Sequence, residues 1–377
     1  MKKIGIITIT DYLNYGNRLQ NYASQELLKS MGFEVESIVN YPVKGNNENL
    51  SLKSRLINAL KQSPVTLFKK GIEKIQEKRN REKYLAGQKA KDLSFRKYNT
   101  KHIDETDFVV TTNDIPADLG SQYDYFVVGS DQIWNPNIRY GSSVDFLTFA
   151  PKEKRIALAP SFGVSTIAQK YEERYSKWIS EMAFLSVREG AGAELIKKLT
   201  GREAPVLIDP TLMLTPEQWL KVAEPARMKP KSKYLLTYFI GALSAKRKKA
   251  LQELADKNFL EIIHLKNLED FDRYDANPGE FIDYIHCADL ICTDSFHSVI
   301  FSMQMRKPFL IFDREGKSAP MSSRIDTLLS TFHFKDRKYS NNTNPEEVLK
   351  IDYSGFEEKL IIECEKVYDY LNTALKK

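Results

Sequence analysis

The stretch that decides the fold of this 377-residue chain is residues 289–302, which read DLICTDSFHSVIFS. A short apolar run ends at Thr293, Asp294 and Ser295, and an apolar helical pattern with His297 in its first turn begins directly afterwards. This order predicts a buried parallel strand that leads into the N-terminus of a helix. Free backbone N–H groups and the helix dipole favour an anion at such a point. A histidine there can transfer a proton near neutral pH, so we expect a site for a phosphate or carboxylate with proton transfer.

The same alternation of strand-like runs and helical patterns continues along most of the chain, and it predicts an α/β fold with parallel sheets. Two successive sets of strands and helices predict two Rossmann-like domains that face a cleft. We expect the first domain at residues 1–175, the second at 176–350, and a C-terminal helix at 351–377 that packs back on the first domain. The strand predicted near Phe184 is assigned to the start of the second set.

Composition narrows the class of protein further. The apolar share of 42% and the charged share of 28% are typical of a globular chain. No run is long and apolar enough to span a membrane, and the apolar start at residues 4–9 is too short for a signal peptide. Three cysteines whose spacing forms no metal motif favour a reducing compartment, so we expect the cytoplasm.

Positive charge is concentrated in a predicted helical insertion at residues 44–103. Between residues 51 and 103 the chain has fifteen Lys and Arg against four Asp and Glu, although the net charge of the whole chain is only +6. This excess has two interpretations, a solvated helical face or a surface that meets anionic lipid headgroups or a polyphosphate substrate. No nucleic-acid-binding module accompanies it, so we expect no nucleic acid partner.

Two further motifs follow predicted strands of the first domain. In residues 11–23, Gly16 allows a tight turn, Asn14 and Asn17 tolerate left-handed backbone, and Arg18 lies where it can meet an anion. In residues 123–136, Ser130 and Asp131 can bind sugar hydroxyls, and Trp134 can stack on a sugar ring. The alternatives are an ordinary strand–helix connection with an exposed arginine, and a helix cap with a core tryptophan.

Two motifs in the second half of the chain are less specific. Asp209-Pro210-Thr211 also follows a strand, and we interpret it as a turn rather than as part of the site. Residues 322–325 offer a second cation, Arg324, whose alternative is an exposed surface arginine. The four other histidines have no convergent partners in the sequence and are interpreted as structural.

Together these segments resemble the polysaccharide pyruvyl transferase family. The resemblance rests on residues 14–23, on VGSDQIWN at 128–135, on Asp209-Pro210-Thr211 and on TDSFHS at 293–298, in that order. It implies a GT-B-like architecture and transfer of the enolpyruvyl unit of phosphoenolpyruvate to a saccharide, with formation of a pyruvate ketal. It also implies work in bacterial surface polysaccharide biosynthesis, on an acceptor that is often attached to a polyprenyl carrier at the inner face of the plasma membrane.

The resemblance also suggests roles for individual residues. Many members have an arginine two positions before the motif histidine, where this chain has Ser295, so the cations that bind the donor must come from elsewhere. The expected catalytic residues are His297, Asp131 and Asp294. The expected donor-binding residues, with no cofactor or metal, are Thr293, Ser295, Ser298, Arg18, Arg188 and Arg324. The expected acceptor-binding residues, on the first domain, are Asn14, Tyr15, Asn17, Ser130 and Trp134.

Two other functions remain open at this stage. The same architecture with a nucleotide sugar as donor would be a glycosyltransferase, and the helix N-terminus would then hold a diphosphate. The missing arginine motivates a third reading, a saccharide-binding member of the family without catalytic activity.

Overall fold

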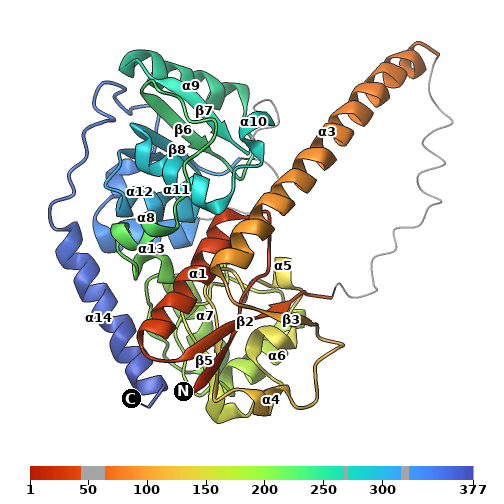
Figure 1. Ribbon diagram of the computed structural model, residues 1–377, viewed down its shortest axis with the longest axis vertical. Helices are drawn as coiled ribbons and strands as arrows, with labels where there is room; N and C mark the ends of the chain where they lie inside the picture. Colours follow the sequence, from red (N-terminus) through yellow and green to blue (C-terminus); the bar gives the residue numbers. More distant parts are fainter. Residues whose placement is uncertain (44–63, 267–270, 316–321, 377) are drawn as a thin grey trace.

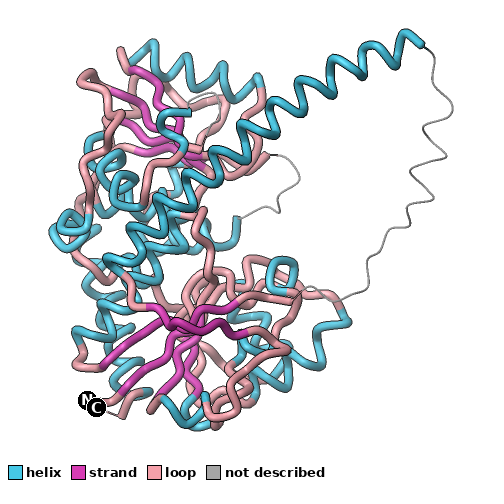
Figure 2. The backbone as a smooth tube through the Cα atoms, turned by 45° about the vertical axis from the view of Figure 1, so that its right-hand side comes forward, coloured by secondary structure: helices cyan, strands magenta, loops and turns pink. Residues whose placement is uncertain are grey.

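The computed structural model describes residues 1–43, 64–266, 271–315 and 322–376. It contains two parallel β-sheets, which Figure 2 shows as separate magenta layers. The first sheet has the strand order β3-β2-β1-β4-β5 and the second has the order β7-β6-β8-β9. The chain therefore folds into two Rossmann-like α/β domains in the GT-B-like arrangement, which confirms the predicted fold class.

The first sheet is made of short strands that are mostly buried on both faces. Its strands are β1 (Lys3–Ile7), β2 (Glu34–Asn40), β3 (Glu105–Val110), β4 (Tyr125–Val128) and β5 (Arg155–Ala157). Continuous apolar runs such as β4, in which every residue is buried, are typical of parallel strands covered by helices on both sides. The helices of this part are α1 (Tyr15–Ser30), α3 (Pro64–His102), α4 (Leu119–Gln122), α5 (Pro136–Arg139), α6 (Gln169–Ser180) and α7 (Gly190–Thr200).

The second sheet repeats this design. Its strands are β6 (Tyr234–Tyr238), β7 (Glu261–Leu265), β8 (Leu290–Thr293) and β9 (Phe309–Ile311). The helices around it are α8 (Pro216–Val222), α9 (Ala245–Asn258), α10 (Phe271–Tyr274), α11 (Pro278–Cys287), α12 (Phe296–Gln304) and α13 (Ser322–Phe332). Short 3-10 helices lie in connections along the whole chain, with η1 (Ser143–Phe146) and η2 (Lys152–Lys154) before β5, η3 (Pro210–Leu212) before α8 and η4 (Lys335–Arg337) after α13.

The stretch that the sequence assigns to the start of the second domain lies elsewhere. Phe184 forms an isolated parallel bridge with Ile156 of β5, and Val187 forms one with Val206. These bridges extend the edge of the first sheet, and the second sheet begins only at β6. The sequence assigned this segment to the wrong sheet, because the apolar pattern of one strand does not show which sheet edge that strand will pair with.

The C-terminal helix α14 (Phe356–Ala374) connects the two domains. It runs along the molecule from the second domain to the first, and the two chain termini lie close together (Figure 1). The hydroxyl of Tyr370 donates a hydrogen bond to the carbonyl of Ala157 at 2.6 Å, and that of Tyr125 donates to the carbonyl of Leu375 at 3.2 Å. These bonds attach the end of the chain to β4 and β5 of the first domain.

The basic insertion is largely the long helix α3. Its C-terminal half lies against the second domain, where the ring of Tyr98 approaches Gly279 of α11, and its N-terminal end extends away from both domains (Figure 1). Residues 44–63 of the predicted insertion lie outside the described residues. Within the described ranges, no helix has the length and apolar character needed to cross a membrane.

Candidate active site

The candidate site begins at the junction of β8 and α12, as the sequence predicts. Ser295 is the N-cap of α12, and its side chain accepts a hydrogen bond from the backbone N–H of Ser298. Thr293 fixes the turn, because its hydroxyl donates to the carbonyl of Tyr238 at 2.6 Å and accepts from the N–H of Ser295 at 3.0 Å. His297 therefore lies in the first turn of α12, with only 6% of its surface exposed.

The first domain approaches His297 through the N-terminus of α1. Asn14 is the N-cap of this helix, and its side chain accepts from the N–H of Asn17. A Cβ atom at Gly16 would lie 2.0 Å from Nδ1 of His297, which is closer than real Cβ contacts allow. Only a residue without a side chain fits here, so Gly16 lets the two domains meet at the histidine.

On the other side of the imidazole ring lies Asp209. Nε2 of His297 is 3.5 Å from Oδ2 of Asp209, and the hydroxyl of Ser130 donates to the same oxygen at 3.0 Å. Arg188 forms a buried ion pair with this oxygen as well. The other carboxylate oxygen, Oδ1, accepts from the N–H of Thr211 at 3.0 Å. Asp209 thus caps the η3 turn with one oxygen and faces the site with the other.

A second carboxylate, Asp131, gathers cations next to this pair. Its Oδ1 lies 3.5 Å from Nη2 of Arg188 and 3.7 Å from Nη1 of Arg324. Its Oδ2 accepts from Nδ2 of Asn17 at 3.3 Å. Asp131 has a φ of 54°, in the left-handed region that aspartate tolerates better than most residues. The guanidinium groups of Arg188 and Arg324 both lie over the ring of Phe296, at 4.5 Å and 5.4 Å from its centroid.

Charge within this cluster shifts its acid–base equilibria. Burial alone would raise the pKa of Asp209, but His297 and Arg188 outweigh burial and hold that pKa well below its usual range. The same competition, with Arg324 added, lowers the pKa of Asp131. Burial and then the neighbouring charge of Arg188 lower the pKa of Arg324 to about 9. Two crowded guanidinium groups of this kind favour the approach of an anionic ligand.

Arg18 belongs to a supporting network rather than to the cluster itself. Its Nε and Nη2 donate to Oδ1 of Asn17, at 3.1 Å and 2.8 Å, and its Nη1 donates to Glu105 at 2.7 Å. Asn17 in turn contacts Asp131. Arg18 is fully buried and paired, so it orients Asn17 and does not point at His297.

Three other predicted site residues also lie apart from the cluster. The carboxylate of Asp294 accepts from the backbone N–H groups of Ile240 and Gly241, at 2.6 Å and 2.9 Å, and so holds the loop after β6. Trp134 lies in the core of the first domain, stacked on Phe146 with its indole N–H donated to a backbone carbonyl. Tyr15 is buried against α11 and donates to the carbonyl of Ala276 at 2.9 Å.

Ser298 is placed close to the predicted anion position. Its hydroxyl is buried in the first turn of α12 and has no hydrogen-bond partner among the described residues. Nε of Arg188 is also buried without such a partner in the described part of the chain. Unsatisfied buried donors are costly, so both groups are suited to a ligand that supplies acceptors.

Sequence reasoning missed Asp209, Gly16 and Phe296 as members of this site. The sequence predicts Asp209 as a turn residue. Asp209 does cap the η3 turn, but it also faces His297. Its position directly after a strand-like run was the signal available, and the second role depends on a contact with His297, 88 positions later. An apolar residue such as Phe296 in an apolar helical pattern predicts a core position. Only the fold shows that Arg188 and Arg324 both lie over its ring.

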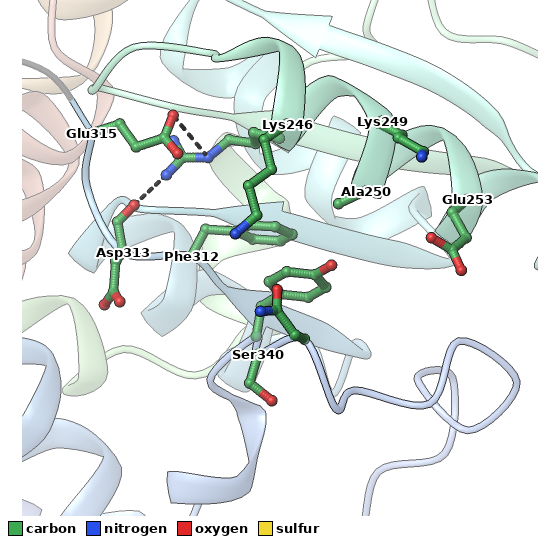
Figure 3. A pocket seen from close by; sticks show the side chains of 11 residues that line it. Lys246, Lys249, Ala250, Glu253, Phe312, Asp313, Glu315 and Ser340 are labelled. Carbon is green, nitrogen blue, oxygen red and sulfur yellow. Dashed lines mark hydrogen bonds and ion pairs between the residues drawn. The ribbon is translucent and has the colours of Figure 1, made fainter.

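Two cavities help to locate ligand space. One of about 200 Å³ lies beside the cluster, with Arg188, Asp209, Phe296 and Arg324 in its wall. Another of about 610 Å³ lies at the N-terminal part of α9 in the second domain and contains none of the predicted site residues (Figure 3). Its charges are mixed, since Lys246, Lys249, Glu253 and Glu315 all line it. Among the described residues, no group of three or more His, Cys, Asp or Glu side chains is arranged to bind a metal ion.

A histidine, two arginines and two carboxylates therefore lie together at the junction of two facing Rossmann-like domains. The model of the polysaccharide pyruvyl transferase family matches residues 14–316, and the chain belongs to this family of transferases. The match includes every site residue named above except Arg324.

Comparison with other proteins adds similarity in fold only. No curated protein sequence matches the chain. The UDP-GlcNAc 2-epimerase from Methanocaldococcus jannaschii is 14% identical, with 96% of this chain and 92% of that chain covered at a TM-score of 0.47. The UDP-GlcNAc 2-epimerase from Neisseria meningitidis is 10% identical, with 98% and 100% covered at a TM-score of 0.41.

Proposed function

We propose that this protein transfers the enolpyruvyl unit of phosphoenolpyruvate to a saccharide and forms a pyruvate ketal, in the biosynthesis of a bacterial surface polysaccharide. The observation that carries the proposal is the buried cluster of His297, Arg188 and Arg324 with Asp131 and Asp209. It combines a proton carrier with two cations at a helix N-terminus, which are the groups that this donor requires.

The donor is a small molecule with a phosphate and a carboxylate. Arg188 and Arg324 are the cations that can neutralise it, and they compensate for the serine at position 295. The first turn of α12 supplies backbone N–H groups and the hydroxyl of Ser298 for its phosphate. In this proposal, the anion draws the arginines from Asp131 and leaves that carboxylate free to act on the acceptor.

His297 carries the first chemical step. It donates a proton to the methylene carbon of phosphoenolpyruvate, so that the central carbon acquires oxocarbenium character. A sugar hydroxyl adds to that carbon and gives its proton to Asp131 or to the neutral imidazole. A second hydroxyl of the same sugar then attacks this carbon and gives its proton to the departing phosphate oxygen. The bond between the carbon and that oxygen breaks, and inorganic phosphate leaves as the ring closes. Asp209 keeps the imidazole oriented through these steps.

Acceptor binding falls to the first domain in this proposal. Asn17 and Ser130 are buried polar groups that lie next to the two carboxylates, Asn17 in the first turn of α1 and Ser130 after the end of β4. They are placed to contact sugar hydroxyls once the donor occupies the arginines. The contacts of Trp134 make it a residue of the domain core, so the proposal does not use it as a stacking platform.

Calorimetry distinguishes this proposal from a glycosyltransferase on the same fold. Phosphoenolpyruvate is expected to bind the wild-type protein with release of heat, and Arg324→Met is expected to weaken this binding by about tenfold or more, since a charged hydrogen-bonding partner of the anion is lost. Binding of a nucleotide sugar without any binding of phosphoenolpyruvate would favour the glycosyltransferase instead.

A further inference from the structure

The side chain of Asn17 lies between Arg18 and Asp131 and contacts both. Its amide nitrogen Nδ2 donates a hydrogen bond to Oδ2 of Asp131 at 3.3 Å. Its amide oxygen Oδ1 accepts from Nε and Nη2 of Arg18 at 3.1 Å and 2.8 Å, and from the backbone N–H of Asp11 at 3.1 Å. Asn17 therefore connects Arg18 to a carboxylate of the candidate site.

Three donors fix which way this amide faces. An asparagine amide can rotate by half a turn, which exchanges its oxygen and its nitrogen. At Asn17 such a rotation would place N–H groups against the guanidinium of Arg18 and the backbone N–H of Asp11. It would also place the amide oxygen against the carboxylate of Asp131, where two acceptors repel. Arg18 and Asp11 therefore keep one amide N–H directed at Asp131, and the second amide N–H remains for a sugar hydroxyl.

Arg18 is held in turn by the first sheet and by α3. Its Nη1 donates to Oε1 of Glu105 at 2.7 Å, and its Nη2 donates to the carbonyl of Ile9 at 2.7 Å. The other oxygen of Glu105, Oε2, accepts from the hydroxyl of Tyr12 at 2.7 Å and from Nδ2 of Asn99 in α3 at 2.6 Å. A chain of hydrogen bonds thus runs from β3 and α3 into the candidate site.

We propose that Arg18 is a positioning residue, which acts through Asn17 to hold Asp131 as the ionised base that receives the proton of the sugar hydroxyl. The inference rests on the proposed function, and it assigns the base in that mechanism to Asp131. A carboxylate that accepts a hydrogen bond is stabilised in its charged form. A fixed donor on Oδ2 also leaves Oδ1 of Asp131 as the oxygen that receives the proton.

The other groups around Asp131 explain why this donor matters during the reaction. Burial raises the pKa of Asp131, and the groups that lower it are His297, Arg188, Arg324 and the backbone N–H of Gln132. In the proposed function, phosphoenolpyruvate draws both arginines toward itself, and burial then opposes the charged carboxylate more strongly. Asn17 belongs to the first domain and does not bind the donor, so its hydrogen bond is retained while the acceptor reacts.

The experiment is a pH titration by NMR of protein that carries a carbon-13 label in its aspartate carboxyl groups. The signal of Asp131 is assigned by its loss in Asp131→Asn. In the wild type it is expected to titrate below the ordinary aspartate pKa of about 4. In Arg18→Met it is expected to titrate about one pH unit or more higher, because the amide of Asn17 can then rotate and a hydrogen bond to a charged group is lost.

The matched control is Arg96→Met. Arg96 lies over the same ring of Tyr12 as Arg18, at 4.0 Å against 5.0 Å from its centroid, but its Nε donates to Asp92 on the exposed side of α3. Its loss is expected to leave the titration of Asp131 unchanged.

Two milder variants test the inference even if Arg18→Met does not fold. Arg18→Lys keeps a cation beside Glu105 but cannot place two donors on Asn17, so it is expected to raise the pKa of Asp131 in the same direction. Asn17→Asp has the shape of the native residue and keeps an acceptor for Arg18. It is expected to form a carboxyl pair with Asp131 that retains one proton above about pH 5, because two adjacent carboxylates resist ionising together.

Unchanged titration of Asp131 in the folded Arg18 variants would overturn the inference, as would the absence of a retained proton in Asn17→Asp. Weakened binding of phosphoenolpyruvate to Arg18→Met, with an unchanged titration of Asp131, would make Arg18 a donor-binding residue instead. The titration needs no acceptor, so it separates this inference from the proposed function. If Asp131 responds as expected but no glycan is pyruvylated, the proposed function fails and only the coupling of Arg18 to Asp131 stands. If glycans are pyruvylated and Asp131 does not respond, the proposed function stands and the inference fails.

Discussion

Replacing His297 with glutamine is expected to reduce the release of phosphate from phosphoenolpyruvate in the presence of a saccharide acceptor by about 10²–10⁴-fold, the range that general acid–base catalysis contributes. Glutamine keeps a hydrogen-bonding group near Asp209 and Ser130 but cannot carry the proton to the methylene carbon. The measurement is the initial rate of phosphate release, with circular dichroism to show that the variant is folded.

The matched control is His333→Asn. His333 is exposed and has a φ of 64°, a conformation that asparagine also adopts readily. The His333→Asn protein is expected to release phosphate at the same rate as the wild type. Retention of near wild-type activity in a folded His297→Gln protein would remove the histidine from the mechanism.

Replacing Arg188 with methionine is expected to cost about 3–5 kcal/mol of unfolding free energy at pH 7, the usual cost of leaving a buried charge unpaired. Arg188 contacts both Asp131 and Asp209, and its own side chain is 1% exposed. Its loss leaves two buried carboxylates with weaker compensation, and their pKa values are expected to rise. Chemical denaturation of both proteins measures the difference.

The pH dependence of this difference provides an internal check. The pKa values of Asp131 and Asp209 are lowered in the folded wild type, so their stabilising contribution is complete above the unfolded carboxylate pKa of about 4. It is lost as the pH falls below that value, where protonation costs the wild type more than the variant. The gap between the two proteins should therefore narrow between about pH 4 and pH 2. An equal difference in unfolding free energy at both pH values would show that lost packing, rather than charge, is responsible.

The control is Arg174→Met, at an exposed position. This substitution is expected to change the free energy of unfolding by about 0.5 kcal/mol or less.

The sequence predicts the ends of strands well, because a parallel strand buried on both faces leaves a continuous apolar run. That is why β8 and the cap of α12 are where residues 289–302 indicate, and why Ser130 and Asp131 are found at the end of β4. Helix starts are less well predicted. Helix α1 begins at Tyr15, inside the segment where the sequence predicts a tight turn at Gly16, because the side chain of Asn14 caps it.

The site residues that were harder to predict depend on contacts between distant segments. Arg18 and Asp294 are charged residues near the carboxyl ends of strands, as a binding site requires, but both are already paired. Arg18 donates hydrogen bonds to Asn17 and Glu105. Asp294 accepts from the backbone N–H groups that follow β6. Conversely, the proposed function assigns the part of the cation missing at position 295 to Arg188 and Arg324, which lie 3.5 Å and 3.7 Å from Asp131. Local sequence shows which side chains can bind an anion, and only the fold shows which of them remain directed at the site.

The central claim is that this site forms a bond between pyruvate and a saccharide. Mass spectrometry of candidate glycans after incubation with the wild-type protein and phosphoenolpyruvate tests it most directly. The account predicts a product heavier than the glycan by one pyruvate less one water, formed with one equivalent of phosphate and absent with His297→Gln. A product heavier by a sugar residue when a nucleotide sugar replaces phosphoenolpyruvate, with no pyruvylated product under either condition, would contradict it.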